Sequence, residues 1–131
     1  MRIELYLLGA TLILALVQIL LAAHLRTRQY GLTWNAGPRD DKMPSLKPLA
    51  GRMLRAQHNL FETLPLFIAA VLGAAVAGRL GMLTSVGAHL YFFGRLIYLP
   101  LYAAGIPYVR SLVWVAATGG LILVIAGLML G

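Results

Sequence analysis

Residues 55–62 read RAQHNLFE, and an uncharged apolar run, residues 63–77, follows them directly. On a helix, Arg55, Asn59 and Glu62 stand at positions i, i+4 and i+7, so they share one face. The stretch therefore carries a cation, an amide and a carboxylate into a segment that can enter a membrane. Burying such groups in lipid is expensive unless they find partners, so we expect them to belong to a functional site.

The composition is that of an integral membrane protein. Of the 131 residues, 60% are hydrophobic and only 11% are charged, whereas about a quarter are charged in a soluble domain. The net charge of +7 comes from basic residues at helix ends and in one loop, which favours anionic lipid headgroups, and we expect no nucleic-acid partner. The chain has no cysteine, and its three histidines lack the spacing of a metal site, so we expect no metal.

Four apolar runs reach the roughly 20 residues that a helix needs to cross the hydrocarbon core. They lie at about residues 5–25, 59–77, 83–104 and 112–130. The chain is therefore predicted to be all-α, an integral membrane four-helix bundle that forms a single transmembrane domain over residues 1–131. The first run is too long for the apolar part of a secretory signal, so we expect it to be retained. Residues 26–54, rich in proline and glycine, are predicted to form a long polar loop.

The distribution of lysine and arginine predicts the topology. Seven basic residues lie within residues 26–55, and Arg110 falls on the same side of the membrane as these. The opposite side holds only Arg2 and Arg79. We therefore expect the long loop to be cytoplasmic and both termini to lie on the non-cytoplasmic side.

A second polar face lies in the third apolar run. Arg95, Tyr98 and Tyr102 stand at i, i+3 and i+7, and Arg95 lies about 15 Å along the helix from its predicted cytoplasmic end. Glu62 is the only acidic residue inside a predicted span, so it is the simplest partner for Arg95, within the bundle or across a subunit interface. Such a pair by itself favours a structural role, that of fixing the register of the helices.

The remaining donors exceed what one carboxylate can pair with. They cluster toward the cytoplasmic ends of three spans, at Arg55, Asn59, Tyr98, Tyr102 and Arg110. Surplus cations together with amide and phenol donors favour a pocket for an anionic, peptide-like ligand. Each residue also has an ordinary explanation, because tyrosines are common at membrane interfaces and arginines on the cytoplasmic side.

Taken together, these residues resemble the MAPEG family, the membrane-associated proteins in eicosanoid and glutathione metabolism. Residues 55–67 are similar to the family's second-helix signature, an Arg-xxx-Asn-xx-Glu pattern followed by a proline and aromatics. The spacing Gly94-Arg95-xx-Tyr98-xxx-Tyr102 resembles the third-helix signature. The pair Arg110-Ser111 resembles the opening of the family's fourth helix.

The resemblance implies a homotrimer that binds glutathione, as a co-substrate, between neighbouring subunits near the cytoplasmic face. It implies that Arg110 is catalytic and stabilises the glutathione thiolate. It also implies a set of glutathione-binding side chains, namely Arg26, Arg55, Asn59, Glu62, Arg95, Tyr98 and Tyr102. The implied function is a membrane glutathione transferase or peroxidase that acts on lipophilic electrophiles or lipid hydroperoxides, in the inner membrane of a bacterium.

Two other functions stay open at this point. The first is a non-catalytic, lipid-binding membrane protein on the same scaffold, since the family also contains such a branch. The second is a purely structural bundle in which Glu62 and Arg95 fix the helix register.

Overall fold

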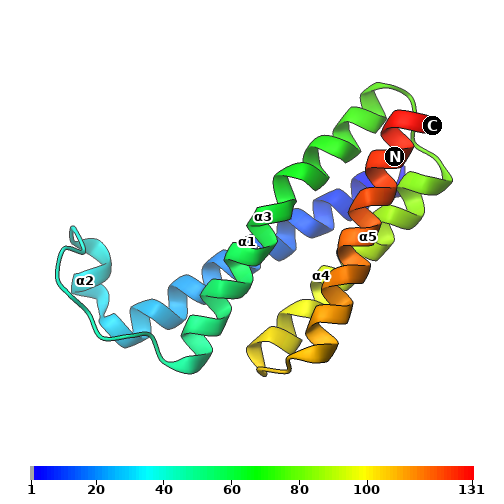
Figure 1. Cartoon of the computed structure of the whole chain (residues 1–131). Coiled ribbons are helices and arrows are strands. Elements are labelled where there is room, and N and C mark those ends of the chain that lie inside the picture. The colour runs from blue at the N-terminus through cyan, green and yellow to red at the C-terminus, as the bar shows by residue number, and fades with distance from the viewer. Residues whose placement is uncertain (1) are drawn as a thin grey trace.

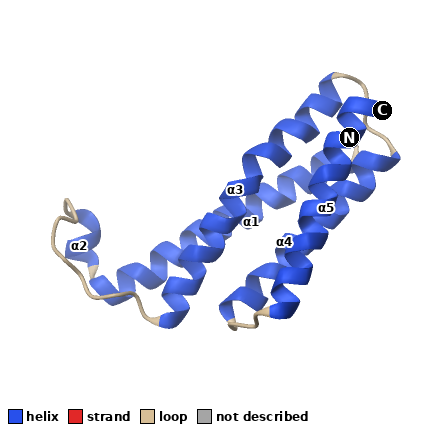
Figure 2. Ribbon diagram, in the orientation of Figure 1, coloured by secondary structure: helices blue, strands red, loops and turns tan. Residues whose placement is uncertain are grey.

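The computed structural model describes residues 2–131, and all the regular secondary structure in that range is α-helical (Figures 1 and 2). The helices are α1 (Ile3–Tyr30), α2 (Leu32–Ala36), α3 (Pro48–Val76), α4 (Met82–Ala103) and α5 (Tyr108–Leu130). The prediction of an all-α chain is confirmed for these residues. The short helix α2 was not predicted.

Three helices, α1, α3 and α5, are long and apolar enough to cross a membrane. Large apolar side chains such as Ile13, Leu20 and Ile122 are exposed along them, as expected for helices that face lipid. Helix α4 has 22 residues but falls outside this set. It carries Arg95 and three tyrosines, which lower its hydropathy, and its crossing of the membrane stays a prediction.

The segment 26–54, predicted as a loop, is helical at both of its ends. Helix α1 continues to Tyr30, where Gly31 adopts a φ of 96° and ends it. Helix α3 already begins at Pro48, a residue suited to the first helical turn because its missing N–H has no partner there. The prediction was wrong at both ends because it followed hydropathy, and the helices extend beyond their apolar runs.

The long helices form two pairs, α1 with α3 and α4 with α5 (Figure 1). Helices α4 and α5 pack more extensively than α1 and α3 do. Their backbones come so close that a Cβ added to Gly87 would lie 2.5 Å from the carbonyl oxygen of Gly120. Small residues at such a seam let helix backbones approach each other in lipid. The first helical turn of α1 and the last turn of α5 lie at the same end of the bundle, while their side of the membrane stays a prediction (Figure 1).

One hydrophobic core joins the two pairs. Leu60 and Phe67 of α3 and Val124 of α5 are completely buried within it. The Phe67 ring stacks on Tyr91 of α4 at a centroid distance of 4.1 Å. The Tyr91 hydroxyl lies 2.8 Å from the hydroxyl of Thr63, so the one polar atom of this ring has a partner inside the core.

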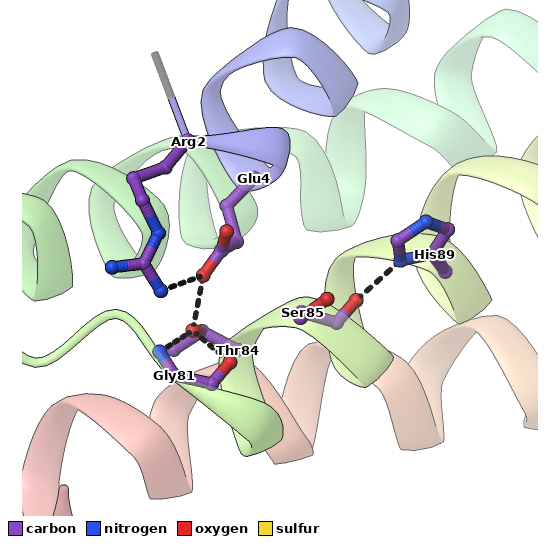
Figure 3. A network of polar contacts seen from close by, with 6 residues as sticks. All are labelled: Arg2, Glu4, Gly81, Thr84, Ser85 and His89. Carbon is purple, nitrogen blue, oxygen red and sulfur yellow. Dashed lines mark hydrogen bonds and ion pairs between the residues drawn. The ribbon is translucent and has the colours of Figure 1, made fainter.

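A buried carboxylate at the terminal end of the bundle was not predicted. Glu4 lies inside α1 and is 0% exposed, so Glu62 is not the only acidic residue in a spanning helix. The Thr84 hydroxyl donates to Glu4 Oε2 at 2.7 Å and accepts from the N–H of Gly81 at 2.8 Å (Figure 3). Arg2 lies 3.9 Å from the same carboxylate oxygen. These contacts fix the start of α1 against the start of α4.

Candidate functional site

Seven of the eight predicted site residues lie on three helices, in the half of the bundle away from the termini, and the eighth, Arg26, lies on α1. Arg55, Asn59 and Glu62 lie on α3, while Arg95, Tyr98 and Tyr102 lie on α4, and Arg110 lies in the first turn of α5. The short turn that ends at Pro107 places the start of α5 beside the end of α4. Three separate stretches of sequence therefore contribute polar side chains to one region.

A small cavity of about 250 Å³ brings three of these residues together. Asn59, Tyr98 and Arg110 line it, with Ser111, Trp114 and Val115 completing its wall. It thus combines an amide, a phenol, a hydroxyl and a guanidinium with an apolar side. Such a surface can hold the polar part of a ligand while an apolar molecule approaches from the lipid.

Arg95 supports the cavity from behind and does not line it. Its side chain is 2% exposed, and its Nη1 donates to Asn59 Oδ1 at 2.8 Å. The predicted pairing of Arg95 with Glu62 is not formed within this chain, because the ion pair found among residues 2–131 joins Arg2 and Glu4. A Glu62–Arg95 pair across a subunit interface stays a prediction.

Two tyrosine rings lie between two arginine side chains in this part of α4 and α5. The Arg95 guanidinium lies 4.4 Å from the ring centre of Tyr98, and Tyr98 meets Tyr102 edge-on at 5.6 Å. The Arg110 guanidinium lies 4.6 Å from the ring centre of Tyr102. Both rings thus stabilise a cation through their faces, which leaves the phenolic hydroxyls free for other partners.

The other predicted binding residues do not line the cavity. Arg26 lies on α1 over the Trp34 ring of α2, with 5.5 Å between its guanidinium carbon and the ring centre. Arg55 and Glu62 are exposed on α3. A single chain therefore presents Arg55 and Glu62 outward and holds Arg26 against α2, and any ligand that joins them to the cavity needs a further surface.

Three residues near the site were not predicted as members of it. Ser111 and Trp114 line the cavity because they follow Arg110 by one residue and by one helical turn, a spacing visible in the sequence. Arg52 of α3 donates to the carbonyl oxygen of Ala103 at 3.4 Å and so caps the end of α4. Only the fold shows the role of Arg52, since the two residues are 51 positions apart.

Comparisons with known proteins place the chain in one family. A search of curated proteins gave no match, and a search of solved structures gave none either. A family model does match, over residues 6–130, which is nearly the whole chain and includes all the candidate site residues. The protein is therefore a member of the MAPEG family.

Proposed function

We propose that this protein is a homotrimeric membrane glutathione transferase, with peroxidase activity toward lipid hydroperoxides. Membership of the MAPEG family supports the broader statement that this is a membrane protein of the type that acts in glutathione and eicosanoid metabolism. The observation that carries the finer proposal is the cavity in which Arg110 stands beside Asn59 and Tyr98. These three side chains offer a cation, an amide and a phenol at the boundary of an apolar helix bundle.

The chemistry of the cavity suits a small acidic peptide with a thiol. The Asn59 amide and the hydroxyls of Tyr98 and Ser111 can bond to peptide amides and carboxylates. Arg110 brings the positive charge that two carboxylates and a thiolate favour. Since the chain has no cysteine, the nucleophilic sulfur has to come from the bound peptide.

Arg110 acts in this proposal as an electrostatic stabiliser. A free thiol has a pKa near 8.5, and an adjacent guanidinium lowers it by favouring the thiolate. The guanidinium stays protonated, so the thiol proton leaves to water and not to Arg110. The thiolate sulfur then forms a bond to the electrophilic carbon, and the leaving group departs with the bonding electrons. With a hydroperoxide, the sulfur takes the distal oxygen to give a sulfenic acid, and the O–O bond breaks to release the alkoxide, which takes a proton from water to give an alcohol. A second glutathione thiol then attacks the sulfenic sulfur, so that the disulfide forms and the oxygen leaves as water.

The proposed trimer accounts for the groups that one chain leaves outside the cavity. At about 250 Å³ the cavity is smaller than the roughly 300–1,000 Å³ typical of ligand sites. Arg55 and Glu62 are exposed on a helix apolar enough to span the membrane, where unpartnered charge is unfavourable. A neighbouring copy that covers this face of α3 would enclose the cavity and give both residues partners.

The decisive test combines glutathione binding with turnover. Purified protein should show a rise in ultraviolet thiolate absorbance when glutathione is added, and it should conjugate a chloronitrobenzene-type electrophile. Arg110→Ala should abolish the absorbance rise and lower kcat at least tenfold, whereas Arg28→Ala, an exposed arginine on α1, should change neither. An unchanged thiolate signal in Arg110→Ala would refute the role of Arg110.

A second candidate function is lipid binding without turnover, and one feature favours it. On the α4–α5 pair lies another cavity, of about 330 Å³, with an almost entirely apolar wall formed by His89, Leu90, Phe93, Gly94, Ile97, Val113 and Ala116. His89 Nδ1 bonds to the carbonyl oxygen of Ser85 at 2.7 Å (Figure 3). If the protein binds lipid but turns over no member of a panel of electrophiles, this function replaces the transferase.

A further inference from the structure

Gln18 is a buried polar residue to which neither the family signature nor the cavity gives a role. It lies in the middle of α1 and is 1% exposed. Its side-chain oxygen, Oε1, has no hydrogen-bond partner among residues 2–131. An amide oxygen inside a membrane-spanning bundle is unfavourable without a donor, so this position calls for one.

Arg95 offers the complementary groups. It is 2% exposed, and its Nη1 is occupied by Asn59, whereas Nε and Nη2 have no partner within the described chain. Of the six buried side-chain atoms without a partner among residues 2–131, Gln18 thus contributes one acceptor and Arg95 two donors. One ordered water can join them in the bundle interior, since such a water needs two to four polar partners.

The register of α1 against α3 places Gln18 at the level of Asn59, which Arg95 contacts. The Lys47 N–H donates to Gln29 Oε1 at 2.7 Å and so anchors the end of α1 to the start of α3. These helices run antiparallel (Figure 1). About eleven residues back along α1 and twelve residues forward along α3, or roughly 16–18 Å, Gln18 comes level with Asn59, the residue to which Arg95 donates.

A second register, measured from the opposite end, agrees with the first. Thr84 donates to Glu4 and anchors the start of α1 to the start of α4. These two helices run in the same direction away from the termini (Figure 1). About fourteen residues from this anchor, Gln18 comes level with Tyr98, which is one turn from Arg95.

We propose that Gln18 is a positioning residue for the ligand site and acts through Arg95. Its Oε1 accepts from an ordered water to which Nε or Nη2 of Arg95 donates, and this bridge fixes the guanidinium. Arg95 Nη1 then holds Asn59 Oδ1 and leaves the amide NH2 of Asn59 to donate into the cavity. The order Gln18, Arg95, Asn59 thus links the interior of α1 to a group that would touch the ligand.

The first test measures glutathione, so it rests on the proposed function. Gln18→Met keeps the shape and removes the acceptor, and it should raise the Kd and KM for glutathione about fivefold with kcat changed less than twofold. Gln18→Glu keeps an oxygen in place and should stay within twofold of the wild type. Thr11→Val is the matched control, because Thr11 is buried on the same helix and, within residues 2–131, its hydroxyl bonds to Leu7 of that helix and to no other helix.

Each outcome of this comparison is decisive. If Gln18→Met and Thr11→Val bind glutathione equally well, the proposal is overturned. If Gln18→Glu loses as much affinity as Gln18→Met, an acceptor oxygen at this position does not account for the affinity, and the proposal is overturned as well. If Gln18→Met does not assemble, Gln18→Asn replaces it, because this substitution withdraws the amide by one methylene. Its KM for glutathione should lie between the values of the wild type and the roughly fivefold increase expected for Gln18→Met. An unchanged KM would refute the link between Gln18 and Arg95.

A second measurement needs no glutathione and separates this proposal from the proposed function. In protein labelled with ¹⁵N-arginine, the Nε–H of Arg95, assigned through Arg95→Lys, should exchange slowly with solvent. Gln18→Met should shift this resonance and speed its exchange, whereas Thr11→Val should leave it in place. An unmoved resonance overturns the Gln18–Arg95 contact, whatever the protein binds. A shifted resonance in a protein that binds no glutathione would keep the contact and reject the transferase.

Discussion

The close approach of α4 and α5 at Gly87 and Gly120 makes a sharp prediction about stability. A Cβ added at Gly120 would lie 2.6 Å from the carbonyl oxygen of Gly87 and 2.7 Å from both Leu90 Cβ and the backbone nitrogen of Tyr91. Two of these three atoms belong to the backbone of α4 and cannot move away by a change of rotamer. Gly120→Ala should therefore force the two helices apart.

The adjacent residue provides the matched control. Gly119 lies on the same helix, and a Cβ added there would meet nothing within 4 Å. Both substitutions gain about 1 kcal/mol of helix propensity, so this contribution cancels in the comparison. What remains is the strain of overpacking, typically about 1–3 kcal/mol, and contacts with backbone favour the upper part of that range. We expect Gly120→Ala to be about 2–3 kcal/mol less stable than Gly119→Ala.

The assay is unfolding of the two variants in one detergent, at one protein concentration and one detergent-to-protein ratio. These conditions have to match because subunit assembly makes the apparent stability depend on protein concentration. Gly119→Ala should melt at or above the temperature of the wild type, and Gly120→Ala should melt well below it. Equal melting temperatures for the two variants would refute the α4–α5 packing described above.

Two further substitutions test other contacts. Thr84→Val keeps the shape but removes the donor to Glu4, so it should lower the free energy of unfolding by about 2 kcal/mol, and by more than Thr11→Val does. Equal losses in the two variants would show that the Thr84–Glu4 contact contributes nothing. Asn59→Leu should raise the Kd for glutathione about tenfold, or ~1.4 kcal/mol, while Gln57→Leu two positions earlier should not. Equal Kd values would remove Asn59 from the ligand site.

The helices could be predicted from the sequence, but their ends could not be predicted from hydropathy. An apolar run stops where the membrane stops, whereas a helix stops where its backbone finds a cap. Gly31, with its positive φ, ends α1 five residues past the predicted span, and Pro48 starts α3 eleven residues before the predicted one. Both residues are visible helix signals, and reading them as caps would have found the ends of the long loop.

Glu4 was missed for a similar reason. A span predicted to begin at residue 5 excludes it, and a carboxylate at a chain end looks like a solvated group. The spacing of the polar residues in α1 indicates a buried position for Glu4. Residues Glu4, Thr11 and Gln18 recur every seven residues and therefore share one helical face. All three are buried, so a polar stripe at heptad spacing was the signal that could have found them.

The site could be predicted in part from the spacing of its residues. Helical periodicity put Asn59 on a polar face of α3 and Tyr98 on a polar face of α4, and the fold brings both to a cavity beside Arg110. Periodicity cannot say which of two neighbouring polar residues reaches the cavity and which supports it. Arg95 and Tyr98 are three residues apart, yet Arg95 is enclosed behind the wall, because this choice depends on how α3 packs against α4.

The polar side chains at the two ends of the bundle differ in what they contact. At the terminal end, hydrogen bonds join Glu4 Oε2, the Thr84 hydroxyl and the Gly81 N–H, while Glu4 Oε1 has no partner among residues 2–131. Arg79 donates there to two carbonyl oxygens in the last turn of α5 at 2.9 Å. At the other end, Arg110 lines the cavity and lies over the Tyr102 ring, and no carboxylate of residues 2–131 pairs with it. Satisfied groups stabilise the fold, whereas surplus donors favour an anionic ligand. Substitutions at the first end should therefore change the melting temperature alone, and those at the second end should also change how much bound glutathione raises it.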